Sequence, residues 1–277
     1  MISVISLIGA TVYAFHWEEL ASVDWEGRFE EKKQVAAEWI ETHRRKSEQE
    51  TGIEANEKIY FCQIAYMSHE FPEQIKLAEE NDILLSVPLI SQEKAGYRTG
   101  CELTSAAMVL QYYGVMAEPE DVYEVIVKDT DLKQAGYQAH PDVCFIGNPK
   151  SYQALGCYVR PLADAMNVLL TEKYHAVNVS GSELEDLVRQ YLRKGTPVIL
   201  WATIDMEEPG EGTGWELRDG SSFQWIAGEH CLVLVGADEK NYYFNDPNHA
   251  GEAVTYEKEV VQERYEQLGR QAIIISR

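Results

Sequence analysis

The sequence predicts an α+β fold in which a helical part carries a cysteine and an antiparallel sheet carries a histidine and an aspartate. Apolar residues recur at helical spacing in residues 103–113, directly after Cys101. Residues 229–236 and 242–247 are rich in β-branched and aromatic side chains and predict two strands of a hairpin. The apolar residues 197–203 predict a further, central strand.

Cys101 stands where this helix is expected to begin, after a strand predicted over residues 87–92. Thr99 is followed three residues later by Glu102, a spacing typical of a capping box with Thr99 as the N-cap. The helix dipole and the free N–H groups of a first turn favour an anion, so this position favours a thiolate. Cys101 is therefore a candidate nucleophile, and the alternative is a buried cysteine that only packs under the helix.

A cysteine nucleophile needs a base, and His230 at the start of the predicted hairpin can supply one. If residues 236–240 form a five-residue connection, Val235 pairs with Asn241. The same register sets His230 opposite Asp246 on one face of the sheet, where the acid would orient the imidazole. The alternative is a core histidine beside a structural aspartate.

These segments resemble the papain-like cysteine peptidases related to bacteriocin-processing, double-glycine leader peptidases, in the branch called C-39-like. The similarity covers the chain from about Leu84 to the C-terminus and is strongest around Cys101 and His230. It implies a papain-like fold and a peptidase without a cofactor. The segments that carry it are, in order, residues 87–114, 145–149, 181–201 and 229–247.

The resemblance also implies a role for each of four residues. Cys101 would be the nucleophile and His230 the general base, oriented by Asp246. Gln92 would be the side-chain donor of the oxyanion hole, beside the backbone N–H of Cys101. Papain uses an asparagine as the third member, which raises Asn245 as an alternative, but the alternation of side chains favours Asp246 because it shares parity with His230.

The expected reaction is hydrolysis of a peptide or other amide bond through a thioacyl intermediate. An acyltransferase that uses the same three residues and a non-catalytic peptide-binding module are the alternatives. Trp201, on the central strand, and Trp225, between a predicted surface loop at residues 207–222 and His230, are candidate substrate-binding residues. Core packing explains Trp201 equally well.

The composition narrows the range of partners. With 46 acidic and 24 basic residues, the net charge of −22 disfavours nucleic acid and anionic lipid surfaces. The five cysteines cannot all be paired within the chain, so at least one thiol is free, as a nucleophile must be. Residues 140–144 together with Cys157 lack the paired spacings of zinc ligands, so no metal is expected.

The sequence predicts three regions along the chain. Residues 1–15 are apolar and almost uncharged but too short to span a bilayer, so we expect a truncated signal or anchor, a membrane-dipping segment or a docked element. This segment favours an extracytoplasmic or membrane-anchored location over a cytoplasmic one, with membrane association through it. Residues 16–82 are expected to form an extension of helices and a strand, and residues 83–277 the catalytic domain. The oligomeric state stays open.

Overall fold

The computed structural model describes residues 82–129, 139–152 and 154–277. The apolar residues 1–15 and, apart from Asp82, the predicted extension over residues 16–82 lie outside the described residues. Among the helices of the described part, none combines the length and the apolar composition needed to cross a membrane.

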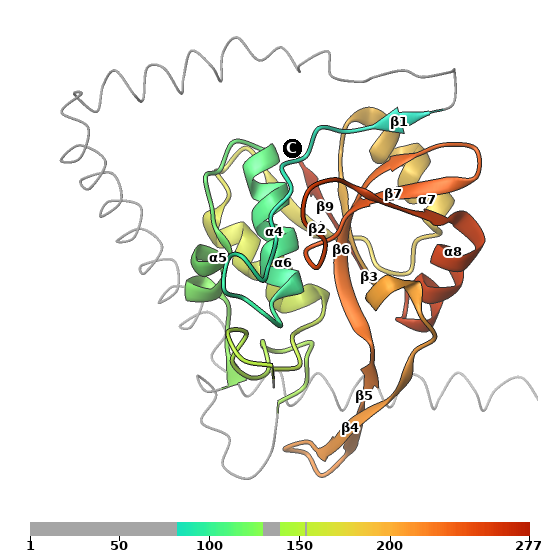
Figure 1. Cartoon of the computed structure of the whole chain (residues 1–277). Helices are drawn as coiled ribbons and strands as arrows, with labels where there is room; N and C mark the ends of the chain where they lie inside the picture. Colours follow the sequence, from blue (N-terminus) through green and yellow to red (C-terminus); the bar gives the residue numbers. More distant parts are fainter. Residues whose placement is uncertain (1–81, 130–138, 153) are drawn as a thin grey trace, which may run out of the picture.

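A seven-stranded antiparallel sheet forms the centre of the domain (Figure 1). The strands follow the order β2-β9-β3-β6-β7-β8, and the short β1 pairs with one end of β6. Strands β3 and β6 are buried along their whole length, which explains why their sequences are almost continuously apolar. The strands are β1 (Ile83–Leu84), β2 (His175–Asn178), β3 (Val198–Thr203), β6 (Glu229–Ala237), β7 (Asn241–Asn245), β8 (Val254–Glu257) and β9 (Ala272–Ser276).

Helices cover both faces of this sheet. Figure 1 shows α4, α5 and α6 grouped on one side and α7 and α8 on the other. Two short 3₁₀ helices, η2 and η3, lie at the two ends of β3. The bounds are α4 (Cys101–Tyr112), α5 (Pro119–Val125), α6 (Val159–Leu169), α7 (Leu184–Gln190), η2 (Leu192–Lys194), η3 (Ile204–Met206) and α8 (Lys258–Gln267).

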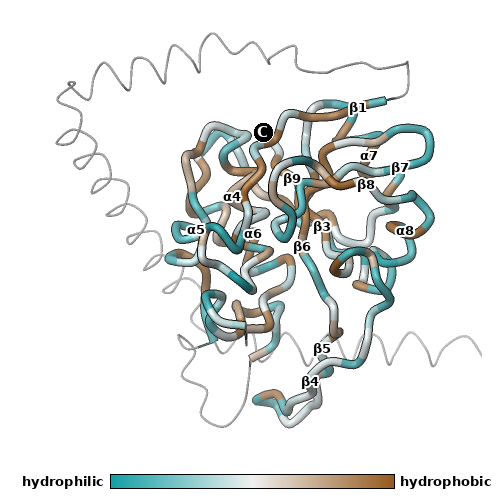
Figure 2. Tube along the Cα trace, in the orientation of Figure 1, coloured by the Kyte–Doolittle hydropathy of each residue, from teal (hydrophilic) through white to brown (hydrophobic). Residues whose placement is uncertain are grey.

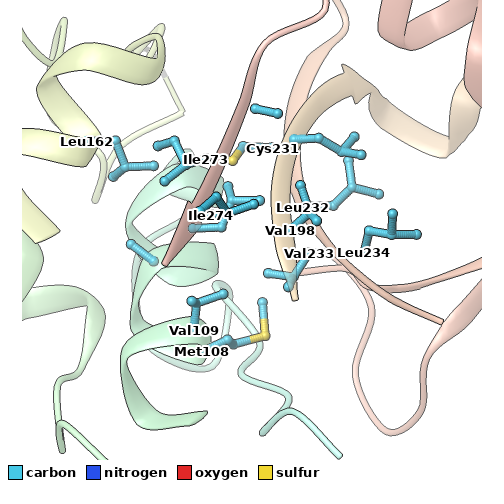
Figure 3. Packing of buried hydrophobic residues seen from close by; sticks show 14 of the residues in the cluster. Met108, Val109, Leu162, Val198, Cys231, Leu232, Val233, Leu234, Ile273 and Ile274 are labelled. Carbon is cyan, nitrogen blue, oxygen red and sulfur yellow. The ribbon is translucent and has the colours of Figure 1, made fainter. Parts of the chain in front are cut away.

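The core joins α4 to the middle of the sheet. Every residue of α4 from Cys101 to Leu110 is buried, and Figure 2 shows apolar residues concentrated in α4, β3 and β6. Met108 and Val109 of α4 belong to the same buried cluster as Val198 of β3 (Figure 3). Each large apolar side chain buried in this way contributes about 1.5–3 kcal/mol, so the start of α4 is held firmly against the sheet. The predicted α+β class, with a helical part and an antiparallel sheet, is confirmed.

The strand predicted over residues 87–92 is not formed. Strand β1 is limited to Ile83–Leu84, and the chain beyond it is irregular up to α4. Pro88 has no N–H to donate to a neighbouring strand. The carbonyls of Val87 and Pro88 instead accept hydrogen bonds from the Asn245 side chain, at 2.8 and 3.2 Å. The Asn245 side chain therefore holds this segment in place, whereas hydrogen bonds from the backbone of a neighbouring strand were expected.

The surface loop predicted over residues 207–222 is largely a strand. β4 (Gly210–Glu216) pairs with β5 (Ser222–Ala227) to form a two-stranded hairpin that projects from the domain (Figure 1). The glycines of this segment suggested a loop, but at least one of them allows close packing. A Cβ atom on Gly212 would lie 2.7 Å from the carbonyl oxygen of Trp225 on the partner strand.

Candidate active site

Cys101 is the first residue of α4, and the N-cap is Gly100. The predicted capping box is wrong, because Thr99 Oγ1 donates to the carbonyl of Ser151 at 2.9 Å and Glu102 is turned into the protein. Thr99 therefore anchors the loop before the helix to a distant segment. The first N–H groups of a helix have no carbonyl partner within it, so the N–H of Cys101 is available to an incoming oxyanion.

Helix α4 places Cys101 beside the strand that carries His230. One turn along the helix, Ser105 Oγ donates to the carbonyl of Cys231 at 3.1 Å. The backbone N–H of Cys231 also lies close enough to the Cys101 thiol to lower its pKa. Because Cys231 directly follows His230, these two contacts fix the thiol next to the start of β6.

His230 and Asp246 form a buried pair, with His230 Nε2 2.7 Å from Asp246 Oδ1. Asp246 follows β7 in a turn, where its Oδ1 also accepts the N–H of Asn248 at 2.8 Å. The second carboxylate oxygen, Oδ2, lies 3.2 Å from Nδ1 of His249. Sequence reasoning missed His249, although an aspartate followed by proline and asparagine is typical of such a turn.

The predicted register of the hairpin is wrong by two residues. The structure pairs Val233 with Asn245, and continuing this register sets Leu232 opposite Asp246. His230 is two residues away from Leu232, so it is the diagonal neighbour of Asp246 on the same face. The prediction that His230 and Asp246 lie on one face of the sheet was correct, and the long histidine side chain spans the diagonal.

A β-bulge makes this shared face possible. The pairing of β6 with β7 shifts by one residue between Leu234 and Gly236, so Val235 is an extra residue in β6. Successive side chains of a strand point to opposite faces, so the register beyond the bulge would turn Asp246 to the face opposite His230. The extra residue restores the parity that brings the acid to the imidazole.

Asn245 points away from His230. Its Nδ2 donates to the carbonyls of Val87 and Pro88, whereas Asp246 contacts the imidazole. The two neighbouring side chains therefore have separate tasks, one on each face of the strand.

Gln92 is held close to the turn that carries Asp246. Its backbone N–H donates to the carbonyl of Pro247 at 2.9 Å. Its buried side chain uses Nε2 to donate to the carbonyl of Arg98 at 2.8 Å, and its Oε1 has no hydrogen-bond partner among the described residues. A primary amide has two N–H hydrogens, so one stays available for an oxyanion.

The surroundings of the Cys101 thiol favour its protonated form. Burial raises its pKa well above the usual range, and the charges of Glu102 and Glu229 raise it further, against the N–H of Cys231, which lowers it. The Cys101 sulfur lies 3.4 Å from Glu102 Oε2, to which it donates. Burial and the two acids therefore oppose the effect of the helix start on this thiol.

The charge of Asp246 determines which ring nitrogen of His230 carries the proton. Burial raises this pKa, but the hydrogen bond and charge of His230, with the N–H of Asn248, outweigh burial and hold it below its usual value. An ionised carboxylate can only accept a hydrogen bond, so Nε2 of His230 carries the proton. Nδ1 is then the ring nitrogen that can accept a further proton.

Trp201 has no exposed surface, and its Nε1 donates to the carbonyl of Cys157 at 3.1 Å. This burial leaves no face for a substrate and supports the core-packing alternative. Trp225 is also buried, in an aromatic cluster where it stacks on Tyr158 with ring centres 5.5 Å apart. Trp215 of β4 stacks on the same tryptophan at 6.5 Å, so the cluster joins the β4–β5 hairpin to the N-cap of α6.

The described cysteines Cys101, Cys144, Cys157 and Cys231 are free thiols. Two groups bring three side-chain ligand atoms within 4.8 Å of one another, and they are Cys101 with Glu102 and Glu229, and Asp205 with Asp246 and His249. We assign no metal to either group, because each contains a side chain already hydrogen-bonded as a member of the Cys101 and His230 site.

A cysteine at a helix start beside a buried histidine–aspartate pair agrees with the resemblance to papain-like peptidases. The chain belongs to the Peptidase_C39 like family, whose model matches residues 84–273. The predicted family is therefore confirmed.

Two relatives illustrate the match. The chain is 27% identical over 182 residues to the uncharacterized protein YvpB of Bacillus subtilis (strain 168), covering 64% of this chain and 69% of the relative. It also matches a crystal structure from Bacillus anthracis described as that of a C39-like peptidase, with a TM-score of 0.64 and 30% identity. That match covers 72% of this chain and 98% of the solved one.

Proposed function

We propose that the protein hydrolyses a peptide or other amide bond through a thioacyl intermediate on Cys101. The observation that carries the proposal is the His230–Asp246 pair, 2.7 Å apart and buried beside the helix start that bears the thiol. Membership of a peptidase-like family supports the reaction class.

Acylation begins with a proton transfer from the Cys101 thiol, because burial raises the pKa of this thiol well above its usual range. Nδ1 of His230 takes the S–H proton as the sulfur attacks the carbonyl carbon of the substrate. The resulting oxyanion is held by the Cys101 N–H and by the second N–H of Gln92 Nε2. The imidazolium then gives its proton to the nitrogen, the C–N bond breaks, and a thioester and a free amine result.

Deacylation repeats these steps with water. His230 removes a proton from a water molecule, whose oxygen attacks the thioester carbonyl. The C–S bond breaks, the carboxylic product leaves, and the proton returns to the sulfur. Asp246 keeps the imidazole in the tautomer that both steps need.

Peptide hydrolysis in ¹⁸O-labelled water tests the proposal. A peptide mixture is incubated with the wild-type protein and with Cys101→Ala, and new termini are identified by mass spectrometry. We expect new carboxyl termini that carry ¹⁸O with the wild type and none with the variant. Cys144→Ala, which removes another buried thiol, is the matched control and should stay active.

The distribution of products separates hydrolysis from acyl transfer in the same experiment. Added hydroxylamine captures a thioester as a hydroxamate, so a hydrolase and an acyltransferase would both give this product. Products dominated by adducts of peptide amines, without ¹⁸O, would favour a transferase. A wild-type protein that binds peptides but leaves every peptide intact would favour a binding module.

A further inference from the structure

Two buried acids that the triad does not use lie against the thiol. Glu102 directly follows Cys101 and is 1% exposed, and Glu229 directly precedes His230 and is 8% exposed. One ligand atom from each of Cys101, Glu102 and Glu229 lies within 4.8 Å of the other two. Each acid is thus the chain neighbour of one reacting residue and packs close to the sulfur.

The hydrogen bonds of the two acids differ. Glu102 Oε1 accepts the N–H of Cys157 at 2.8 Å, and its Oε2 accepts the S–H of Cys101 at 3.4 Å. Glu229 Oε1 is buried without a hydrogen-bond partner in the described structure. A buried carboxylate oxygen without a hydrogen-bond donor is strongly unfavourable. Glu229 is therefore protonated more readily than Glu102.

The two acids cannot both be charged at this separation in a buried site. Burial raises the pKa of Glu102 to about 7. Burial, and then the charge of Glu102, raise the pKa of Glu229 well above its usual value. Near neutral pH the pair therefore holds at least one proton, and the two carboxyls titrate as a coupled pair.

Several other titratable groups face this pair from the elements packed around it. Together they set the charge that the sulfur experiences. They are Cys101 on α4, Cys157 and Tyr158 before α6, and His230 and Cys231 on β6. Among them His230 is the one that carries a positive charge when it is protonated.

We propose that Glu102 and Glu229 share a proton and act as positioning residues that set the protonation state of the Cys101 thiol. A charged Glu102 holds the S–H by accepting its hydrogen bond and repels a developing thiolate. A protonated Glu102 instead donates a hydrogen bond to the thiolate. The inference rests on the proposed function, but its effect on the sulfur can be measured without a substrate.

Alkylation of Cys101 by iodoacetamide, followed by peptide mass spectrometry across a pH series, tests this inference. Glu102→Gln keeps an acceptor for the Cys157 N–H but removes the charge next to the sulfur. We expect its profile to move to lower pH by about one unit, with about tenfold faster alkylation near neutral pH. Glu252→Gln, which removes an exposed acid, should leave the profile unchanged.

Glu229→Gln, alone and combined with Glu102→Gln in a double variant, tests whether the two acids share a proton. Glu229→Gln alone should shift the profile less than Glu102→Gln, because one charge stays in the pair. The double variant should shift it most, and by an amount different from the sum of the two single shifts. Single and double profiles that coincide with the wild type would overturn the inference.

Infrared spectroscopy gives a readout on the folded wild-type protein. A protonated buried carboxyl has its own carbonyl stretch, which should be present near neutral pH and disappear in the double variant. Absence of this band from the wild type would overturn the inference. If instead the acid variants shift the profile but His230→Ala does not, the acid pair stands and the proposed base fails.

Discussion

Asp246 reaches His230 diagonally across β6 and β7, with Oδ1 2.7 Å from Nε2. The contact depends on the extra residue Val235, without which the two side chains would lie on opposite faces of the sheet. The bulge is therefore part of the site, although it lies several residues from the reacting atoms.

Replacing Asp246 by Asn should remove activity while keeping the shape of the site. The amide can donate to Nε2, which moves the ring proton to Nδ1 and removes the base. In a serine protease the same type of change lowers kcat about 10⁴-fold, and we expect a loss of about 10²–10⁴ here. Steady-state kinetics on a cleaved peptide measures it, and a loss below tenfold would count against the orienting role.

Replacing Gln92 by Ala should weaken the oxyanion hole. Loss of one oxyanion donor lowers kcat about 10²–10³-fold. KM should change little, because the oxyanion forms only during the reaction. If KM rises and kcat is kept, Gln92 binds the ground state and is not an oxyanion donor.

Replacing Gly236 by Ala should destabilise the bulge. A Cβ atom there would lie 2.6 Å from the carbonyl oxygen of Ile83 and 2.9 Å from Cδ1 of Leu84. Forcing an atom into packed structure costs about 1–3 kcal/mol in the free energy of unfolding. Urea denaturation measures it, with Gly210→Ala, where the nearest atom is 3.7 Å away, as the control. Equal stabilities of the two variants would contradict the close packing at the bulge.

The pH dependence of stability should report on Glu102. Its pKa is raised by burial to about 7 in the folded protein, whereas an unfolded glutamate titrates at about 4.3. Between these values the folded state keeps a proton that the unfolded state has lost, so this contribution is full below the lower value and is lost as pH rises.

Glu102→Gln should therefore flatten the fall in unfolding free energy between about pH 4.5 and 7. Urea denaturation of the wild type and the variant at several pH values in this window measures the difference. The two slopes should differ by about 1 kcal/mol per pH unit, since one proton corresponds to 1.36 kcal/mol per unit. Parallel curves would mean that the acid is ionised in the folded protein throughout.

Much of this arrangement could be predicted from the sequence. The spacing of apolar residues gave the helix after Cys101, and the alternation along the hairpin gave the face shared by His230 and Asp246. The bulge at Val235 could not be predicted, because one extra residue leaves the apolar pattern of a fully buried strand unchanged. The raised pKa of Cys101 was missed because it depends first on the burial of the thiol in the folded domain, and then on the charges of Glu102 and of the distant Glu229.

The alkylation rate of Cys101 in the wild type and in His230→Ala tests the central claim most directly. Cys101 keeps some exposed surface, whereas Cys144, Cys157 and Cys231 have none, so iodoacetamide should label Cys101 first among them. An imidazolium beside the sulfur favours the thiolate, so His230→Ala should slow this labelling near neutral pH about tenfold or more. Labelling of Cys101 at the same rate in both proteins, across the whole pH series, would contradict the pairing of Cys101 with His230.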